Sequence, residues 1–239
     1  QMLSYEIPMG LAILIVVLTS GELRLENIVT SQLESTWFVL LHPIAFVMLL
    51  ITAFAEANRA PFDLAEAEQE LIGGYQTEYG AMKMGMFYLG EYAHMITSSA
   101  FMAVLFLGGW ELFPSSSKLG IEWINRFNTE PSWLFVFLRF GVLAFKIFLF
   151  ICVFMWVRWT LPRFRFDQLM RLAWRGMVPL GMLLLGWTGV LVYLGRPISI
   201  WATLGELAIC VGAIVWTGLR QPTVTGRQVT LPPVPGTTA

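Results

Sequence analysis

Long apolar runs, separated by short polar stretches, dominate the pattern of this sequence. Most of these runs reach the ~18 to 25 residues that a helix needs to cross about 30 Å of hydrocarbon. Apolar and polar residues do not alternate with a period of two, so a closed barrel is not indicated and helices must satisfy the backbone. The pattern therefore predicts an all-α, polytopic integral membrane protein with six transmembrane helices, at about residues 5–20, 37–55, 81–109, 132–157, 176–194 and 198–219.

Two details of this pattern concern its first and last runs. The first run is the shortest, with Pro8 near its start and Gly10 inside it. The last two runs meet at residues 194–197, which read LGRP, and this break leaves room only for a tight hairpin.

The composition agrees with a lipid environment. The chain of 239 residues is 56% apolar and only 13% charged, against roughly 25% charged residues in soluble domains. One core could not hide so much apolar surface, so a soluble globular protein is excluded. The formal net charge of −1 offers no basic surface to a nucleic acid.

Arginine placement predicts the orientation, because cationic loops stay in the cytoplasm. The connection 158–175 is therefore cytoplasmic, and the connection 56–80 and both chain ends share that face. The connections 21–36 and 110–131 lie outside. Residues 220–239, rich in Pro, Thr and Gly, are expected to form a flexible tail. The arginines of the cytoplasmic connection are Arg158, Arg163, Arg165, Arg171 and Arg175.

The sequence shows no spacing typical of a metal or cofactor site. Cys152 and Cys210 each lie inside an apolar run and are expected to be small buried hydrophobes. Nucleotide-binding loops and a Ser/His/Asp constellation are not recognisable. The chain begins at Gln1 without the features of a secretory signal, and we expect that it lacks its beginning.

The connection 56–80 holds six acids and one cation, Arg59. Pro61 suits the first turn of a short helix, on which Glu66 would neighbour Asp63 and Glu70 at about 6 Å. At an effective dielectric near 20, such a pair of carboxylates costs roughly 2 to 3 kcal/mol, which raises one pKa by about 2 units if water is excluded. These acids could then bind and release protons near neutrality. The alternative is an ordinary solvated acidic loop.

Ionisable residues also occur inside the predicted spans, where an unpaired charge costs at least about 2.5 to 3.5 kcal/mol. They imply a polar, hydrated interior and a protein that handles protons or ions. Each has a structural alternative: His42 precedes Pro43 and could cap freed backbone, and Arg139 and Lys146 could snorkel or pair structurally. The set comprises Glu6, His42, Glu91, His94, Arg139, Lys146 and Glu206.

Several stretches resemble a known family. Residues 56–64 read EANRAPFDL, followed by EAEQEL at 66–71 and GYQTEY at 74–79. Residues 1–8 (QMLSYEIP), 88–92 (YLGEY) and 162–170 (PRFRFDQLM) match as well. They resemble the H subunit of bacterial NADH:quinone oxidoreductase, which corresponds to NADH dehydrogenase subunit 1 of mitochondrial complex I. The resemblance covers about residues 1–195. Family members carry further N-terminal helices, and some have a ninth span, to which 198–219 would correspond.

The resemblance implies a membrane-arm subunit in the bacterial inner membrane, or the mitochondrial inner membrane in a eukaryote. Its substrate would be quinone, with flavin and iron–sulfur clusters held by peripheral-arm partners, and with small and antiporter-like membrane subunits beside it. The resemblance places Arg59, Phe62, Asp63 and Arg158 at the quinone cavity. It assigns the proton or charge route to Glu6, Glu56, Glu66, Glu68, Glu70, Glu78 and Glu91.

Three other functions stay open on the sequence. The first is the equivalent subunit of a related hydrogenase or of a dehydrogenase with another donor, which need not bind quinone. The second is an independent ion-coupled transporter, which would transport after purification alone. The third is a passive scaffold, for which buried acids are hard to justify.

Overall fold

The computed structural model describes residues 2–57, 61–62, 80–112, 132–162, 164–195 and 198–219. Every regular element in these ranges is helical, which agrees with the predicted all-α class. The elements are α1 Met2–Ser20, α2 Leu25–Glu34, α3 Phe38–Leu41, α4 Pro43–Glu56, α6 Ala81–Leu107, α9 Trp133–Thr160, α10 Phe166–Arg171, the π-helical segment η3 Leu172–Met177, α11 Val178–Tyr193 and α12 Ile200–Leu219.

Three helical segments of the described chain are long and apolar enough to cross a membrane: Met2–Ser20, Trp133–Thr160 and Phe166–Tyr193. Pro43–Glu56 and Ile200–Val215 are apolar but shorter. The helical membrane protein predicted above is therefore supported, whereas six complete spans are not confirmed. Helix α2 was not predicted, because only a few apolar side chains anchor it, among them the buried Ile28 and Val29.

The run predicted as one span at 37–55 is divided at His42. The backbone of His42 leaves helical geometry (φ −127°, ψ 64°), which ends α3, and Pro43 begins α4. Proline lacks the N–H that would continue the hydrogen-bond ladder and disfavours helical geometry in the residue before it. The break therefore follows from the His-Pro pair and leaves the His42 side chain buried between two helices.

The connection predicted at 158–175 is shorter than expected. Helix begins at Phe166 and continues through η3 into α11, so it starts ten residues before the predicted span at 176. Arg171 and Arg175 interrupt the apolar run but remain exposed, whereas Ala173 and Met177 are buried four residues apart. A helix can thus extend beyond the apolar run while only one of its faces packs.

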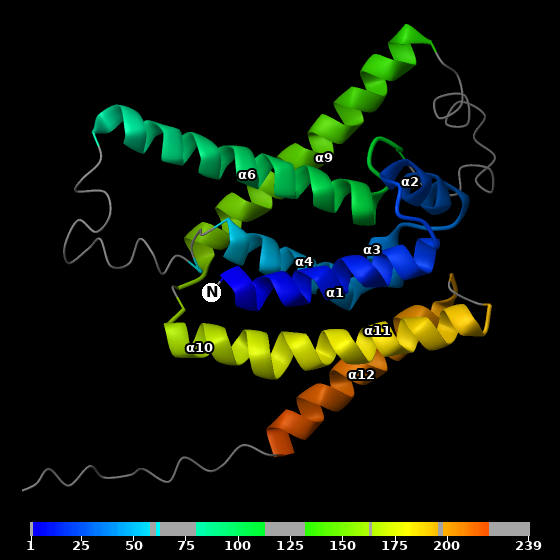
Figure 1. The fold of residues 1–239 in the computed structure, drawn as a ribbon. Coiled ribbons are helices and arrows are strands. Elements are labelled where there is room, and N and C mark those ends of the chain that lie inside the picture. Colours follow the sequence, from blue (N-terminus) through cyan, green and yellow to red (C-terminus); the bar gives the residue numbers. More distant parts are fainter. Residues whose placement is uncertain are drawn as a thin grey trace, which may run out of the picture.

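Helix α1 packs against both α4 and α11 at the centre of the bundle (Figure 1). The contact with α11 is close at Gly181, where an added Cβ would lie 3.0 Å from side-chain atoms of Leu11 and Met48. Helices α6 and α9 cross on one side of this group, and α12 packs on α11 at the other (Figure 1). The arrangement places the start of α1 and the end of α4 at the same end of the bundle.

Lys146 of α9 holds the end of α6. Its ammonium donates hydrogen bonds to the carbonyls of Leu107 (2.7 Å), Gly109 (2.9 Å) and Glu111 (2.6 Å). Gly108 ends α6 in the left-handed region (φ 70°), which turns these carbonyls toward one point. These contacts support the structural alternative for Lys146, because all three of its donors are used by backbone.

Candidate functional site

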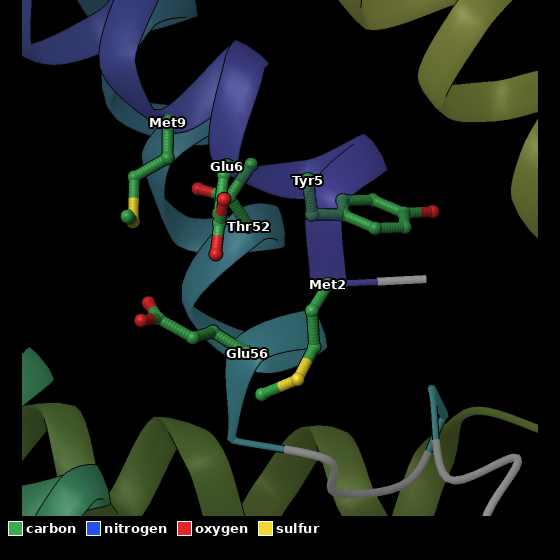
Figure 2. A pocket seen from close by; sticks show the side chains of 6 residues that line it. All are labelled: Met2, Tyr5, Glu6, Met9, Thr52 and Glu56. Carbon is green, nitrogen blue, oxygen red and sulfur yellow. The ribbon is translucent and has the colours of Figure 1, made fainter.

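Two of the predicted acids, Glu6 of α1 and Glu56 of α4, line one small cavity. Its volume is about 30 Å³, enough for about one water molecule. The rest of its lining consists of Met2, Tyr5, Met9 and Thr52. Figure 2 shows that the Tyr5 ring points away from the two carboxylates. Glu6 is exposed and Glu56 is half-buried. The structure thus brings together two acids that lie fifty residues apart in sequence.

Helix α6 brings an imidazole to the same site. His94 Nε2 lies 3.7 Å from Glu56 Oε2, and both side chains remain about one-third exposed. Ser98 Oγ, one turn further along α6, lies 3.2 Å from the same nitrogen. Glu91, half-buried, precedes His94 by three residues and shares its face of α6. We call Glu6, Glu56 and His94 the inner acidic site; the contact of His94 with Glu56 was not predicted.

Phe62 lies beside this site in a cluster of aromatic rings. It is buried, with its ring centroid 5.6 Å from that of Tyr5 and 5.5 Å from that of Phe164. The Phe164 N–H donates to the Pro61 carbonyl at 3.1 Å, and the Tyr5 hydroxyl donates to the Leu169 carbonyl at 3.0 Å. These contacts fix the chain after α4 against the start of α1 and the segment before α10.

Arg158 lies at the same end of the bundle, in the last turn of α9, and its side chain is exposed. One turn earlier Phe154 packs on Phe54 of α4, with ring centroids 4.1 Å apart. This packing places the end of α9 beside the end of α4, two residues before Glu56.

The other predicted site residues lie outside the described residues. They are Arg59 and Asp63 of the quinone cavity and Glu66, Glu68, Glu70 and Glu78 of the charge route. The proposed mutual repulsion of the acids in the connection 56–80 therefore stays a prediction.

A second buried polar group lies at the opposite end of α4. His42 Nδ1 lies 2.6 Å from Glu206 Oε1, and Thr19 Oγ1 lies 2.8 Å from His42 Nε2. Sequence reasoning noted His42 and Glu206 separately and did not pair them. The one available signal was an ionisable residue inside each of two apolar runs, which does not show that the two residues meet.

The described residues contain no group of three or more His, Cys, Asp and Glu side chains placed to hold a metal ion. Cys152 and Cys210 are free thiols and are half-buried, less buried than predicted, because parts of α9 and α12 face outward.

Comparisons with known proteins agree with the quoted motifs. The model of a family described as NADH dehydrogenase matches residues 1–189. The NADH-quinone oxidoreductase H subunit of Flavobacterium psychrophilum is 47% identical over 197 residues, covering 81% of this chain and 54% of that protein. The corresponding protein of Rhodospirillum rubrum, which bears the same name, is 46% identical over 75% of this chain and 49% of its own length.

The protein of that name from Deinococcus deserti is 39% identical over 98% of this chain and 58% of its own length, so the matched part includes α12. This chain spans about half the length of these relatives. The family match over residues 1–189 and the identities above 30% show that the chain belongs to the NADH dehydrogenase family.

Proposed function

We propose that this chain is part of the membrane subunit that couples quinone reduction to proton translocation in an NADH:quinone oxidoreductase. The observation that carries the proposal is the inner acidic site, where carboxylates from α1 and α4 share a cavity and one of them, Glu56, faces an imidazole from α6. The names of the relatives supply the reaction and the quinone substrate.

The inner acidic site has the groups that proton transfer needs. The distance of 3.7 Å between Glu56 and His94 exceeds a direct hydrogen bond, which spans about 2.7 to 3.2 Å. A water molecule or a small rotation of these partly exposed side chains connects them. The cavity has room for a water between Glu6 and Glu56. Protons then pass among Glu6, Glu56 and His94, with Glu91 the next acid on α6.

Quinone approaches from the side of Phe62 in this proposal. The buried ring of Phe62 and its aromatic neighbours form an apolar wall next to Tyr5, which borders the cavity. Arg59, Asp63 and Arg158 supply charge toward the quinone head group, and Glu66, Glu68, Glu70 and Glu78 extend the route. A change in quinone charge alters the proton affinity of these acids, which links reduction to proton movement.

The remaining features follow the family. Six spans cross the bacterial inner membrane, with α3 and α4 together forming one of them. Peripheral-arm subunits with flavin and iron–sulfur clusters dock at the end that carries the inner acidic site. Small and antiporter-like membrane subunits continue the route in the membrane.

Glu56→Gln in the intact complex tests the proposal, because glutamine keeps the shape of the side chain and cannot exchange a proton. Coupled NADH:quinone reduction should fall by about tenfold or more, as expected for loss of a proton-transfer group. The NADH:ferricyanide reaction at the flavin should persist. Glu91→Gln and Glu70→Gln should behave in the same way.

Glu22→Gln is the matched control, since Glu22 is an exposed acid just after α1, at the opposite end of the bundle. Quinone reduction in Glu56→Gln that equals the rate in Glu22→Gln would contradict the proposal. Transport by the purified chain alone would instead favour an independent transporter.

A further inference from the structure

Thr19, His42 and Glu206 form a continuous hydrogen-bonded chain in the interior. Both His42 and Glu206 are 0% exposed. The Thr19 hydroxyl lies 2.8 Å from His42 Nε2 and also 2.8 Å from the Ile15 carbonyl. The second carboxylate oxygen of Glu206 accepts a hydrogen bond from the Ile44 N–H at 3.3 Å.

These contacts limit where protons can lie. A carboxylate oxygen and an imidazole nitrogen 2.6 Å apart need a proton between them, because two lone pairs would otherwise face each other. The Thr19 hydroxyl has one proton and two neighbours. If the hydroxyl donates to the Ile15 carbonyl, then His42 Nε2 must carry its own proton and donate to Thr19 Oγ1. If the hydroxyl donates to His42 Nε2 instead, that nitrogen carries no proton.

The same heavy-atom positions therefore accept two proton counts. With two protons, one on His42 Nε2 and one on Glu206 Oε1, the imidazole and the carboxyl are both neutral, as burial favours, and the pair has no net charge. With one proton, shared between Nδ1 and Glu206, the pair carries one negative charge. Rotation of the Thr19 hydroxyl, from the Ile15 carbonyl to Nε2, is the accompanying change in hydrogen bonding. Uptake of a proton thus requires no rearrangement of the helices.

A backbone donor at the start of a helix also faces the Glu206 carboxyl. Ile44 is the second residue of α4, which has 14 residues, so Glu206 lies at the positive end of that helix. Of the other titratable groups on α1, α4 and α12, Tyr5, Glu6 and Glu56 lie at the far ends of α1 and α4, and Cys210 follows Glu206 by one turn. The charged residues of α2 and its flanks and the Tyr193 side chain are exposed, namely Glu22, Arg24, Glu26, Glu34 and Tyr193.

A hollow lies near this chain, although none of its three residues lines the hollow. It has a volume of about 290 Å³ and is lined by residues of α3, of the start of α12 and of the segments before them. Thr203 forms part of its wall, donates to the Leu40 carbonyl at 3.2 Å, and precedes Glu206 by three residues. One helical turn therefore separates Glu206 from a space large enough for several waters.

We propose that Thr19, His42 and Glu206 form a second proton-binding site, which takes up and releases one proton through the hollow at Thr203. His42 directly precedes α4 and Glu56 is its last residue, so the two lie about 20 Å apart at 1.5 Å per residue. The site is therefore separate from the inner acidic site. It stands on its own geometry and does not depend on the function proposed above.

Infrared spectra of the purified complex, recorded across a pH series in H₂O and in D₂O, test this site. The wild type should show a protonated carboxyl band that shifts in D₂O and disappears as the pH rises. Glu206→Gln should lose this band, because the amide has no acidic proton. Glu22→Gln, which changes an exposed acid, should keep it.

Three further variants distinguish a proton site from a merely structural contact. His42→Gln should keep the band at a changed frequency, because its hydrogen-bond partner becomes an amide. Thr19→Val should change the pH at which the band disappears. Thr19→Ser, which keeps a hydroxyl, should show the wild-type pH. Thr203→Val should slow deuterium exchange of the band.

The proposal is overturned if the Glu206→Gln spectrum equals the wild type, or if the band does not change with pH. Should Glu206→Gln fail to assemble, an unchanged band in both His42→Gln and Thr19→Val overturns it equally. Loss of activity in Glu56→Gln has no bearing on these spectra, so the two proposals can fail separately.

Discussion

Lys146→Met removes the ammonium that holds the end of α6 while it keeps an unbranched apolar side chain of similar length. Lys146 is 9% exposed, and its nitrogen donates to three carbonyls at 2.6 to 2.9 Å. The ammonium also lies 5.9 Å from the centre of the Trp37 ring, within reach of a cation–π contact. The substitution leaves three carbonyls without this donor and takes one cation away from the nearby Glu111 carboxyl.

The free-energy cost follows from these contacts. Hydrogen bonds to a charged group contribute about 1.5 to 3 kcal/mol each, and they are not additive when they share one donor. Leaving a buried acceptor without its partner costs about 1 to 3 kcal/mol, so the three carbonyls together lose at least about 3 kcal/mol. At about 1.4 kcal/mol per tenfold, the lower bound corresponds to a local opening that is about 100-fold more frequent.

Hydrogen exchange of the intact complex, measured by mass spectrometry on peptides covering residues 104–112, reports this opening. The amides of Gly109 and Glu111 donate to Ala103 and Gly108 in the closed turn. They should exchange about 100-fold faster in Lys146→Met. An increase below about threefold would refute the reasoning, since the three carbonyls would then gain little from the ammonium. Lys83→Met, at an exposed position of α6, should leave the exchange unchanged.

Three other substitutions have expected outcomes. Gly205→Ala places a Cβ in the space of the Trp187 indole. It should lower the thermal midpoint of the complex, because overpacking costs about 1 to 3 kcal/mol, whereas Gly212→Ala, with open space around it, should leave the midpoint unchanged. Tyr5→Phe loses the hydroxyl bond to a carbonyl of α10 and should cost about 1 kcal/mol in denaturant titrations. Burial raises the pKa of Glu111, against the opposing charges of Arg139 and Lys146, so protonation favours the folded state. The wild type should therefore lose stability relative to Glu111→Gln as the pH rises through that raised pKa, and parallel melting curves at every pH would contradict this.

The sequence alone determined the helical class and the approximate bounds of most helices. The start of α9 at Trp133 and of α6 at Ala81 lie within one residue of the predicted starts. Gly195, in the predicted break after α11, adopts the left-handed geometry (φ 68°) that glycine favours. These features can be predicted because they depend only on residues that are neighbours in sequence. The length of an apolar run decides whether it can cross lipid, and Gly and Pro fix which backbone angles are allowed.

Only the tertiary structure decided which polar side chains meet. Glu6 and Glu56 share a cavity because α1 packs along α4, and His42 reaches Glu206 because α12 folds back beside the break before Pro43. Lys146 contacts backbone carbonyls, and the pattern of side chains along the sequence does not predict such contacts. The physical reason is that helix rotation and crossing are set by packing over the whole bundle, so an ionisable residue in an apolar run signals a need for a partner without identifying it.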